Sequence, residues 1–114
     1  MNLRRGAVVL VDLEPTRGRE QRGTRPCLVV SDPAVAAAQR FPLLCVVPLT
    51  TAPGRGVLYP RLAPGKSGLK KPSHAIVEQV RSVDKRRVRR VYGTITDAEL
   101  AAVDEGLLLY LGLA

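Results

Sequence analysis

The sequence has 114 residues, the size of one ordinary domain, and with 46% apolar and 25% charged residues its composition is globular and excludes a disordered chain. No apolar run approaches the length of a membrane span, and Asp12 interrupts the first run too early for a signal peptide. From these two features we expect a cytoplasmic protein with no membrane partner. The net charge is +8.

Arginine dominates the positive charge. Fourteen of the eighteen basic residues are arginine, and all eighteen precede residue 97, where six acidic residues accompany them for a net of +12. The planar guanidinium group binds phosphate through two parallel hydrogen bonds. A nucleic acid or another phosphate-bearing partner is therefore expected, with a solvated basic surface as the alternative.

Short strands account for most of the chain up to residue 95. They are expected at Ala7–Leu13, Pro26–Ser31, Leu43–Leu49, Val57–Leu62, His74–Val80 and Arg87–Gly93. The run 43–49 is wholly apolar, which predicts a central strand. Pro60 predicts an edge for the strand 57–62. Asp32 followed by Pro33 is typical of a helix start and predicts a short helix over Ala34–Gln39.

The C-terminal segment has a helical pattern. Residues 96–99 read Thr-Asp-Ala-Glu, a capping box with Thr96 as the N-cap. Apolar residues then recur at spacings of three and four at Leu100, Val103, Leu107 and Leu111, which predicts about four helical turns. Many short strands with one or two helices favour a small β-barrel with a packed terminal helix, formed by one domain over residues 1–114.

The polar loop over residues 14–25 is the first candidate site. It is longer than a hairpin needs, and long loops in small domains are often functional. It carries Arg17, Arg19, Arg22 and Arg25, which could bind phosphates, although a solvated charged loop is equally compatible. Arg25 precedes Pro26, which restrains it to extended backbone and directs its side chain consistently.

Hydroxyl and polar side chains form the second set of candidates. Thr50 and Thr51 follow the apolar strand, where a hydroxyl can orient a phosphate, donate a proton or cap a turn. Glu78 and Gln79 lie in a short apolar strand. They could read base edges or hold Arg25, or one of them simply faces water.

The remaining chemistry is sparse. Cys27 and Cys45 each lie in an apolar run and are expected to be buried free thiols. The single histidine, His74, excludes a two-histidine metal or acid–base site, and no metal or cofactor is expected. Four aromatic residues argue against an aromatic platform for single strands. The basic run Lys85–Arg90 is either a solvated strand edge or a phosphate-steering patch.

Seven short motifs follow one another along the chain: Arg5–Val9, Gly18–Gln21, Gly23–Pro26, Val47–Thr50, Gly68–Lys71, Glu78–Asp84 and Ala102–Asp104. Each is weak alone. The ordered set covers nearly the whole chain and resembles the MazF/PemK family of toxin endoribonucleases.

The resemblance implies a mostly β fold, an SH3-like barrel of the CcdB/MazF plasmid-toxin type with a C-terminal helix and a short helix after the second strand. It implies a homodimer that inhibits growth by metal-independent, sequence-specific cleavage of single-stranded RNA, typically mRNA. It also implies a cognate antitoxin that folds over the toxin and blocks its groove.

The resemblance further implies that Arg25 and Thr50 are the catalytic pair. Residues expected to bind RNA or support the pair are Arg17, Arg19, Glu20, Gln21, Arg22, Thr51, Ser73, Glu78, Gln79 and Arg81. Relatives often carry Asp-Ser where this chain has Pro72 and Ser73. The cleaved sequence therefore cannot be carried over from them.

RNA supplies its own nucleophile, the 2′-hydroxyl, so the protein must stabilise charge on phosphorus and move protons. Arg25 suits the first task and is a poor base, because its pKa is above about 12. Two alternatives remain: a CcdB-like toxin that binds a topoisomerase, and a non-catalytic RNA-binding barrel. Arg25 and Thr50 discriminate among them, since binding alone does not need this pair.

Overall fold

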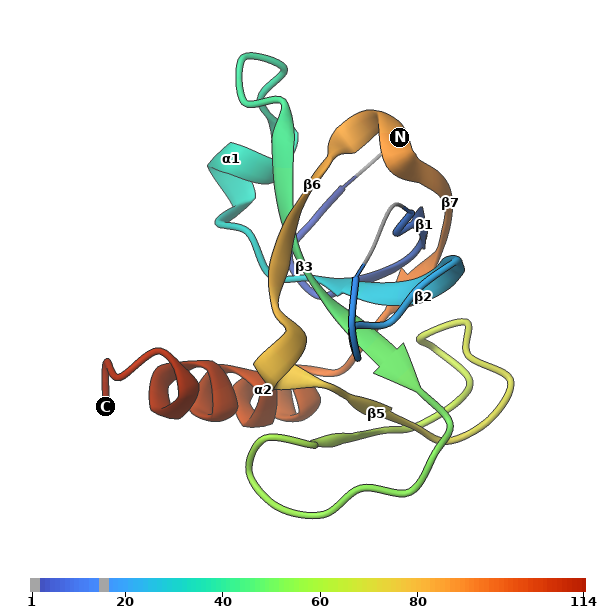
Figure 1. Cartoon of the computed structure of the whole chain (residues 1–114), viewed down its shortest axis with the longest axis vertical. Helices are drawn as coiled ribbons and strands as arrows, with labels where there is room; N and C mark the ends of the chain where they lie inside the picture. The colour runs from blue at the N-terminus through green and yellow to red at the C-terminus, as the bar shows by residue number, and fades with distance from the viewer. Residues whose placement is uncertain (1–2, 15–16) are drawn as a thin grey trace.

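The computed structural model describes residues 3–14 and 17–114 (Figure 1). Within these ranges the strands pair antiparallel in the order β4-β5-β3-β2-β1-β7, and β6 pairs with β3. Their bounds are β1 Ala7–Asp12, β2 Thr24–Val29, β3 Leu43–Thr50, β4 Arg61–Leu62, β5 Ser73–Ala75, β6 Arg81–Asp84 and β7 Val88–Thr94. The helices are α1 Pro33–Ala37 and α2 Asp97–Tyr110, and two short 3-10 helices are η1 Val77–Gln79 and η2 Lys85–Arg87.

The sheet curls into a partial barrel, and α2 lies across one of its ends (Figure 1). The register between β1 and β7 shifts at Val8/Val9 and again at Leu10/Val11. Such irregularities bend a strand and increase its twist. The predicted small barrel with a terminal helix and a short helix after the second strand is therefore confirmed.

The core lies on both sides of β1. Val9 and Val11 pack into one apolar cluster, with Leu44 of β3. Val8 packs into a second cluster, with Val103 of α2. Successive strand residues point to opposite faces, so a strand buried on both faces reads as the continuous apolar run seen in the sequence.

Both helix starts follow the predicted capping chemistry. The Asp32 carboxylate accepts a hydrogen bond from the Ala34 N–H at 3.0 Å, and Pro33 opens α1. Thr96 Oγ1 accepts from the Glu99 N–H at 3.1 Å, while the Glu99 carboxylate accepts from the Thr96 N–H at 2.9 Å. The capping box of α2 is thus confirmed.

The helix α1 ends earlier than its pattern indicates, whereas α2 has the predicted length of about four turns. α1 stops at Ala37, two residues short of Gln39, and the Lys85 ammonium donates to the Val35 and Ala38 carbonyls there. In α2, Val103 is buried, whereas Leu111 is 54% exposed. The packed apolar face of α2 therefore stops before Leu111. No helix in the described ranges is long and apolar enough to cross a bilayer.

The second half of the sheet differs most from the prediction. The strand expected over 74–80 ends at Ala75, and η1 follows because Val77 turns inward and is buried, its N–H donating to the Leu58 carbonyl. The chain then forms β6, a strand that the sequence did not predict. β3 is long enough to pair with β6 at its first half and with β5 at its end.

Two other predicted strands have different bounds in the structure. The strand expected over 57–62 is reduced to Arg61–Leu62 at the sheet edge, because residues 56–59 form a turn closed by the Tyr59 N–H and the Gly56 carbonyl. The strand expected over 26–31 begins two residues earlier, at Thr24.

Candidate active site

A hollow of about 100 Å³ lies where β2 begins and β3 ends, and we call it the active-site hollow. Its lining residues are Arg25, Pro26, Leu49, Thr50, Thr51 and Ser73. Cys27 on β2 is the partner of Pro48 on β3. Continued by two residues toward the start of β2 and the end of β3, this register brings Arg25 level with Thr50, and side chains two residues apart on a strand point to the same face.

The guanidinium of Arg25 is exposed and held at one end. Its Nε donates a hydrogen bond to the Arg22 carbonyl at 2.9 Å. Among the described residues nothing accepts a hydrogen bond from its two Nη groups. The side chain is therefore oriented by its own loop and keeps a pair of donors for an anion.

The hydroxyl of Thr50 is oriented by the turn that follows β3. Its Oγ1 accepts a hydrogen bond from the Ala52 N–H at 3.1 Å. The two interpretations of this residue, turn cap and functional hydroxyl, are compatible, because a hydroxyl that accepts one bond still has its own proton to donate. Thr51 is exposed beside it, whereas buried Ser73 donates its proton to the Lys71 carbonyl at 3.1 Å.

A larger hollow of about 410 Å³ adjoins the first and shares Thr50 with it. Among its lining residues are Gln21, His74, Glu78 and Gln79. The Gln79 side-chain oxygen accepts a hydrogen bond from the Gln21 N–H at 2.7 Å. This bond connects η1 to the arginine-bearing loop over residues 14–25, which we call the basic loop. Gln79 thus holds the loop that carries the arginines, rather than Arg25 itself.

Glu78 also has a partner other than Arg25. Its carboxylate accepts a hydrogen bond from the Tyr59 hydroxyl, which raises the pKa of Tyr59. Tyr59 and Arg55 line this hollow but lie in the 51–60 loop, where no motif pointed to them. A tyrosine amid Gly and Pro residues was the only sequence signal available. His74 pairs with Thr50 across β5 and β3, and its Nδ1 is buried without a hydrogen-bond partner among the described residues.

Only part of the basic loop lines the two hollows. Arg17, Arg19 and Arg22 are exposed, and none of them lines either hollow. An Arg81 Nη1 lies 3.9 Å from a Glu20 carboxylate oxygen, so this pair links the loop to β6. Residues 15 and 16 of the loop lie outside the described ranges.

Most of the basic run 85–90 is occupied by structural contacts. Lys85 binds α1, and Arg86 pairs with Asp84 and holds the pKa of Asp84 down at about 2. Arg89 pairs with Asp12 at 3.3 Å. A hollow of about 440 Å³ at this end has both acidic and basic walls and is therefore a poor anion site.

Neither cysteine is placed for chemistry. Cys27 and Cys45 are free thiols, and burial raises the pKa of both, to about 12 for Cys27. Cys27 is buried as predicted, and Cys45 is half-buried. Within residues 3–14 and 17–114, no group of three or more His, Cys, Asp or Glu residues could hold a metal ion.

The comparisons with known proteins agree on one group. Residues 4–111 match the sequence profile of the PemK-like, MazF-like toxin of type II toxin–antitoxin systems. The chain is 40% identical to Endoribonuclease MazF9 of Mycobacterium tuberculosis, over 97% of this chain and 98% of the relative.

Solved structures give the same result. A crystal structure of MazF from Deinococcus radiodurans superposes with a TM-score of 0.80 at 27% identity, over 96% of each chain. A MazE–MazF crystal structure from the same organism gives 0.76 at 26% identity, over 100% of this chain and 99% of the other. The expected SH3-like toxin barrel is thereby confirmed.

The chain belongs to the PemK-like, MazF-like toxin family. Its likeness to MazF9 extends over nearly the full length of both proteins. It is accordingly an enzyme of that family, an endoribonuclease toxin of a type II toxin–antitoxin system.

Proposed function

We propose that this endoribonuclease cuts single-stranded RNA, typically mRNA, within a short sequence, and that Arg25 and Thr50 are its catalytic pair. One observation carries the proposal. The two side chains line one hollow, each is oriented by a backbone hydrogen bond, and each keeps a donor for a phosphate.

In the proposed mechanism the 2′-hydroxyl of the RNA loses its proton as its oxygen attacks the adjacent phosphorus, and the bond from phosphorus to the 5′-oxygen breaks. The departing 5′-oxygen takes up a proton, so that one proton in total passes from the 2′-oxygen to the 5′-oxygen. Negative charge grows on the non-bridging oxygens, where the Nη groups of Arg25 stabilise it. The Thr50 hydroxyl donates a hydrogen bond that orients the phosphate. The products are a 2′,3′-cyclic phosphate, which can open to a 3′-phosphate, and a 5′-hydroxyl.

The remaining polar residues support this pair by position. Gln79 and Gln21 hold the basic loop beside the hollow, and Glu20 links that loop to Arg81. The exposed arginines of the loop attract the RNA backbone from solvent. Because RNA contains its own nucleophile, the reaction needs no metal-bound water, and we propose that neither metal nor cofactor takes part.

The partners follow from the family. One related structure is a MazE–MazF complex from Deinococcus radiodurans, and another is a mycobacterial endoribonuclease in complex with its cognate antitoxin. We propose that this chain likewise binds a cognate antitoxin, which covers the active-site hollow. We further propose that it acts in the cytoplasm as a homodimer of single-domain subunits.

Incubation of the purified protein with a long RNA in excess EDTA tests the function directly. We expect discrete fragments with 5′-hydroxyl ends, which ligation requiring a 5′-phosphate will miss until the ends are phosphorylated. Binding without any cleavage indicates a passive RNA-binding barrel. Neither binding nor cleavage, together with capture of a topoisomerase, indicates the CcdB-like alternative.

A further inference from the structure

We propose that the surface hollow between β2 and the 63–72 loop binds one nucleotide of the RNA, next to the bond that is cut. The proposal rests on the proposed function and adds a binding site to it. The hollow has a volume of about 290 Å³ and is lined by Pro26, Gly68, Leu69, Lys70 and Tyr92. We call it the Tyr92 hollow.

The Tyr92 hollow adjoins the active-site hollow. Pro26 lines both of them, and it directly follows Arg25 in β2. Thr50, in turn, lines both the active-site hollow and the larger hollow beside it. Each of the two neighbouring hollows therefore shares one lining residue with the active-site hollow, and an RNA strand that continues past a cut phosphate needs binding surface of this kind beside it.

The walls of the Tyr92 hollow are held in place by the sequence. Gly68 has a φ of +79°, and a Cβ there would lie 2.6 Å from the Tyr92 Cβ. Ser67 is buried, donates to the Ala63 carbonyl at 2.8 Å and accepts from the Leu69 N–H at 3.2 Å. These hydrogen bonds hold the loop in shape, and the Thr94 N–H of β7 donates to the Lys66 carbonyl at 3.3 Å and joins the loop to the strand. Little ordering is therefore needed when a ligand enters.

The chemistry of the walls suits a nucleotide. Pro26, Leu69 and Tyr92, a residue that is 36% exposed, offer apolar surface for a base. Lys70 lines the same hollow, and the Arg90 guanidinium lies 5.5 Å from the centre of the Tyr92 ring. The described lining residues include no acidic side chain. An aromatic ring beside cations is the pattern by which proteins bind single strands.

Affinity for RNAs of increasing length tests the proposal. The cut site is first mapped on a long RNA, and oligonucleotides are then made around it with a 2′-O-methyl group that blocks attack. They are extended one nucleotide at a time on each side, and their affinity is measured by fluorescence anisotropy. For the wild type, one particular extension improves affinity about tenfold, the effect of one stacked base.

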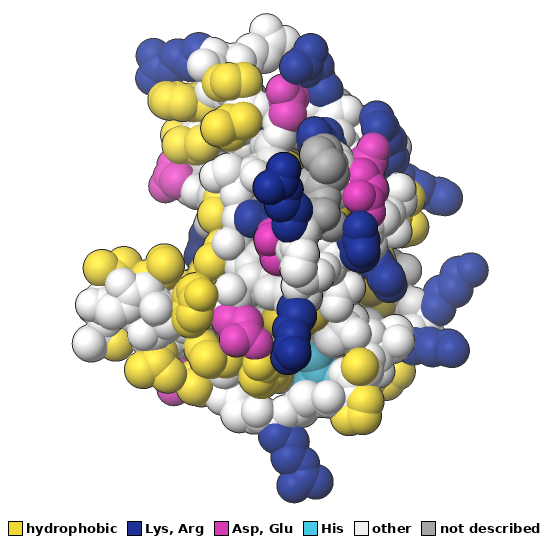
Figure 2. All heavy atoms as spheres, viewed as in Figure 1, with side chains coloured by type: hydrophobic (Ala, Val, Ile, Leu, Met, Phe, Trp, Pro, Cys, Tyr) yellow, Lys and Arg dark blue, Asp and Glu magenta, His cyan; other side chains and the backbone are white. Residues whose placement is uncertain are grey.

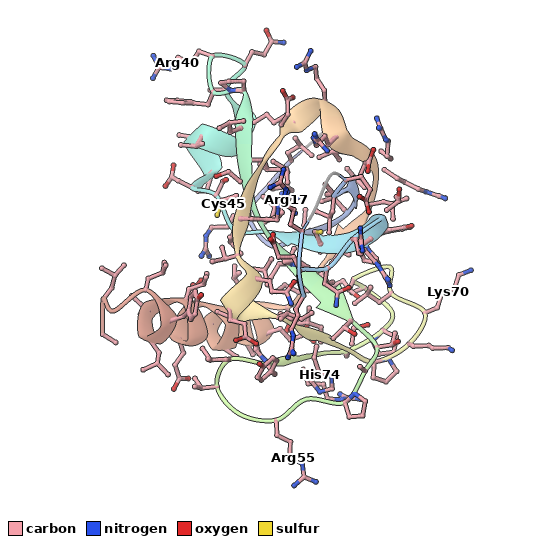
Figure 3. The ribbon with its side chains drawn as sticks, in the orientation of Figure 1. Arg17, Arg40, Cys45, Arg55, Lys70 and His74 are labelled. Atoms are coloured by element: carbon pink, nitrogen blue, oxygen red, sulfur yellow. The ribbon has the colours of Figure 1, made fainter. Side chains whose placement is uncertain are left out.

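The variants identify where that nucleotide binds. Tyr92→Leu abolishes the gain from that extension, whereas Tyr92→Phe, which keeps the ring, retains it. Lys70→Gln lowers the log–log salt slope for the extended oligonucleotide by about 0.7, because one phosphate contact is lost. Arg40→Gln removes an equal charge at the upper left of the molecule in Figure 3, far from Lys70 at its right edge, and leaves the slope unchanged.

The outcomes separate this site from the proposed function. If every extension has the same effect in wild type, Tyr92→Leu and Lys70→Gln, the nucleotide site is refuted while RNA cleavage stands. If these variants weaken antitoxin binding alone, the hollow serves a protein partner and the proposal is wrong. If the wild type neither binds nor cuts RNA, the proposed function itself fails. Lys70 is exposed, so its variant remains informative even where a Tyr92 variant does not fold.

Discussion

Arg25 lies near the start of β2 and Thr50 is the last residue of β3, so the two residues that we propose as the catalytic pair meet only after these strands have paired. The residue types could be chosen from the sequence, because Arg25 precedes a proline and Thr50 follows a wholly apolar run. Their meeting depends on the register that makes Cys27 the partner of Pro48. Register is a property of the sheet, and the pattern of single segments does not fix it.

We expect Arg25→Ala to lower the single-turnover rate of RNA cleavage about 10²–10³-fold, the usual loss for one preorganised donor to a developing anion. RNA affinity falls much less, because other exposed arginines remain. Arg25→Lys restores only part of the rate, since an ammonium group lacks the planar pair of donors. The rate is measured on a fluorescent RNA with EDTA present. Wild-type cleavage by Arg25→Ala would show that another group carries the charge stabilisation.

Thr50→Val keeps the shape of the side chain and removes the hydroxyl, which accepts a hydrogen bond from the Ala52 N–H in the wild type. We expect slower cleavage with nearly unchanged RNA affinity, because the lost donor acts on the phosphate at the reacting centre. Thr50→Ser keeps a hydroxyl and retains part of the activity. Parallel measurements of single-turnover rate and anisotropy separate the two effects. Equal rates for Thr50→Val and wild type would direct the search to His74 or Glu78.

At the scale of elements, the prediction succeeds where one segment carries its own signals. The helix α2 was found from its capping box and its apolar spacing, and both lie within the segment. The strand predicted over 74–80 was wrong beyond Ala75, because the chain turns at η1 and buries the Val77 side chain there. Within the basic run 85–90, Arg86 pairs with Asp84 and Arg89 pairs with Asp12, and neither ion pair could be predicted from the run itself.

The capping box gives a prediction on stability. Thr96→Ala removes the acceptor of the Glu99 N–H, and we expect a loss of about 1 kcal/mol in the free energy of unfolding. Burial works to raise the pKa of Glu99, but hydrogen bonds from the Thr96 and Ala63 N–H groups outweigh it and lower that pKa. The charged form therefore stabilises the fold above the ordinary pKa of 4.5.

The stabilisation of the fold by the charged Glu99 carboxylate decreases in acid. It is lost as the pH falls through the lowered pKa of Glu99 in the folded protein. We expect Glu99→Gln to be less stable than wild type at pH 7 and to approach wild type at about pH 3, below the ordinary range of a carboxyl group. Urea unfolding at both pH values measures the difference. Glu105→Gln, an exposed change on the same helix, is the control. A difference that persists unchanged at the lower pH would contradict the assignment.

At the scale of the whole molecule, the distribution of charged and apolar side chains over the surface bears on the choice of partner. On the face shown in Figure 2, apolar side chains gather over α2 and near α1, while basic side chains are spread across the middle and the right. Net charge and its sequence asymmetry predicted a phosphate partner. They could not show which arginines are free, because ion pairs such as Arg89 with Asp12 form only in the fold.

RNA binding should depend on salt through the exposed cations. For a single strand the log–log slope is about −0.7 for each phosphate neutralised, and we expect roughly three to five contacts and a slope of about −2 to −3.5. Arg19→Gln reduces the slope by about one contact if the basic loop follows the backbone. Anisotropy titrations over a tenfold range of salt measure it. A flat affinity over that range would remove the basic loop from the binding surface.

The exposed apolar surface at the C-terminal end of α2 indicates a dimer. Leu109 and Leu111 are each 54% exposed and Leu113 is 71% exposed, next to the half-exposed Tyr110. A second copy of the chain can cover this surface symmetrically, and burying one leucine contributes about 1.5–3 kcal/mol. We therefore expect a dimer at micromolar concentration, and we expect Leu109→Lys combined with Leu111→Lys to shift it to monomer.

Light scattering over a concentration series distinguishes the two masses. Ala101→Lys adds a charge at an exposed position of the same helix, remote from the apolar end, and should leave the dimer intact. Because the Arg25 and Thr50 hollow lies on β2 and β3 rather than on α2, the monomeric variant keeps the proposed catalytic pair in place. Loss of cleavage by a folded monomer would mean that the partner subunit completes the RNA site. A wild-type monomer at these concentrations would refute the interface.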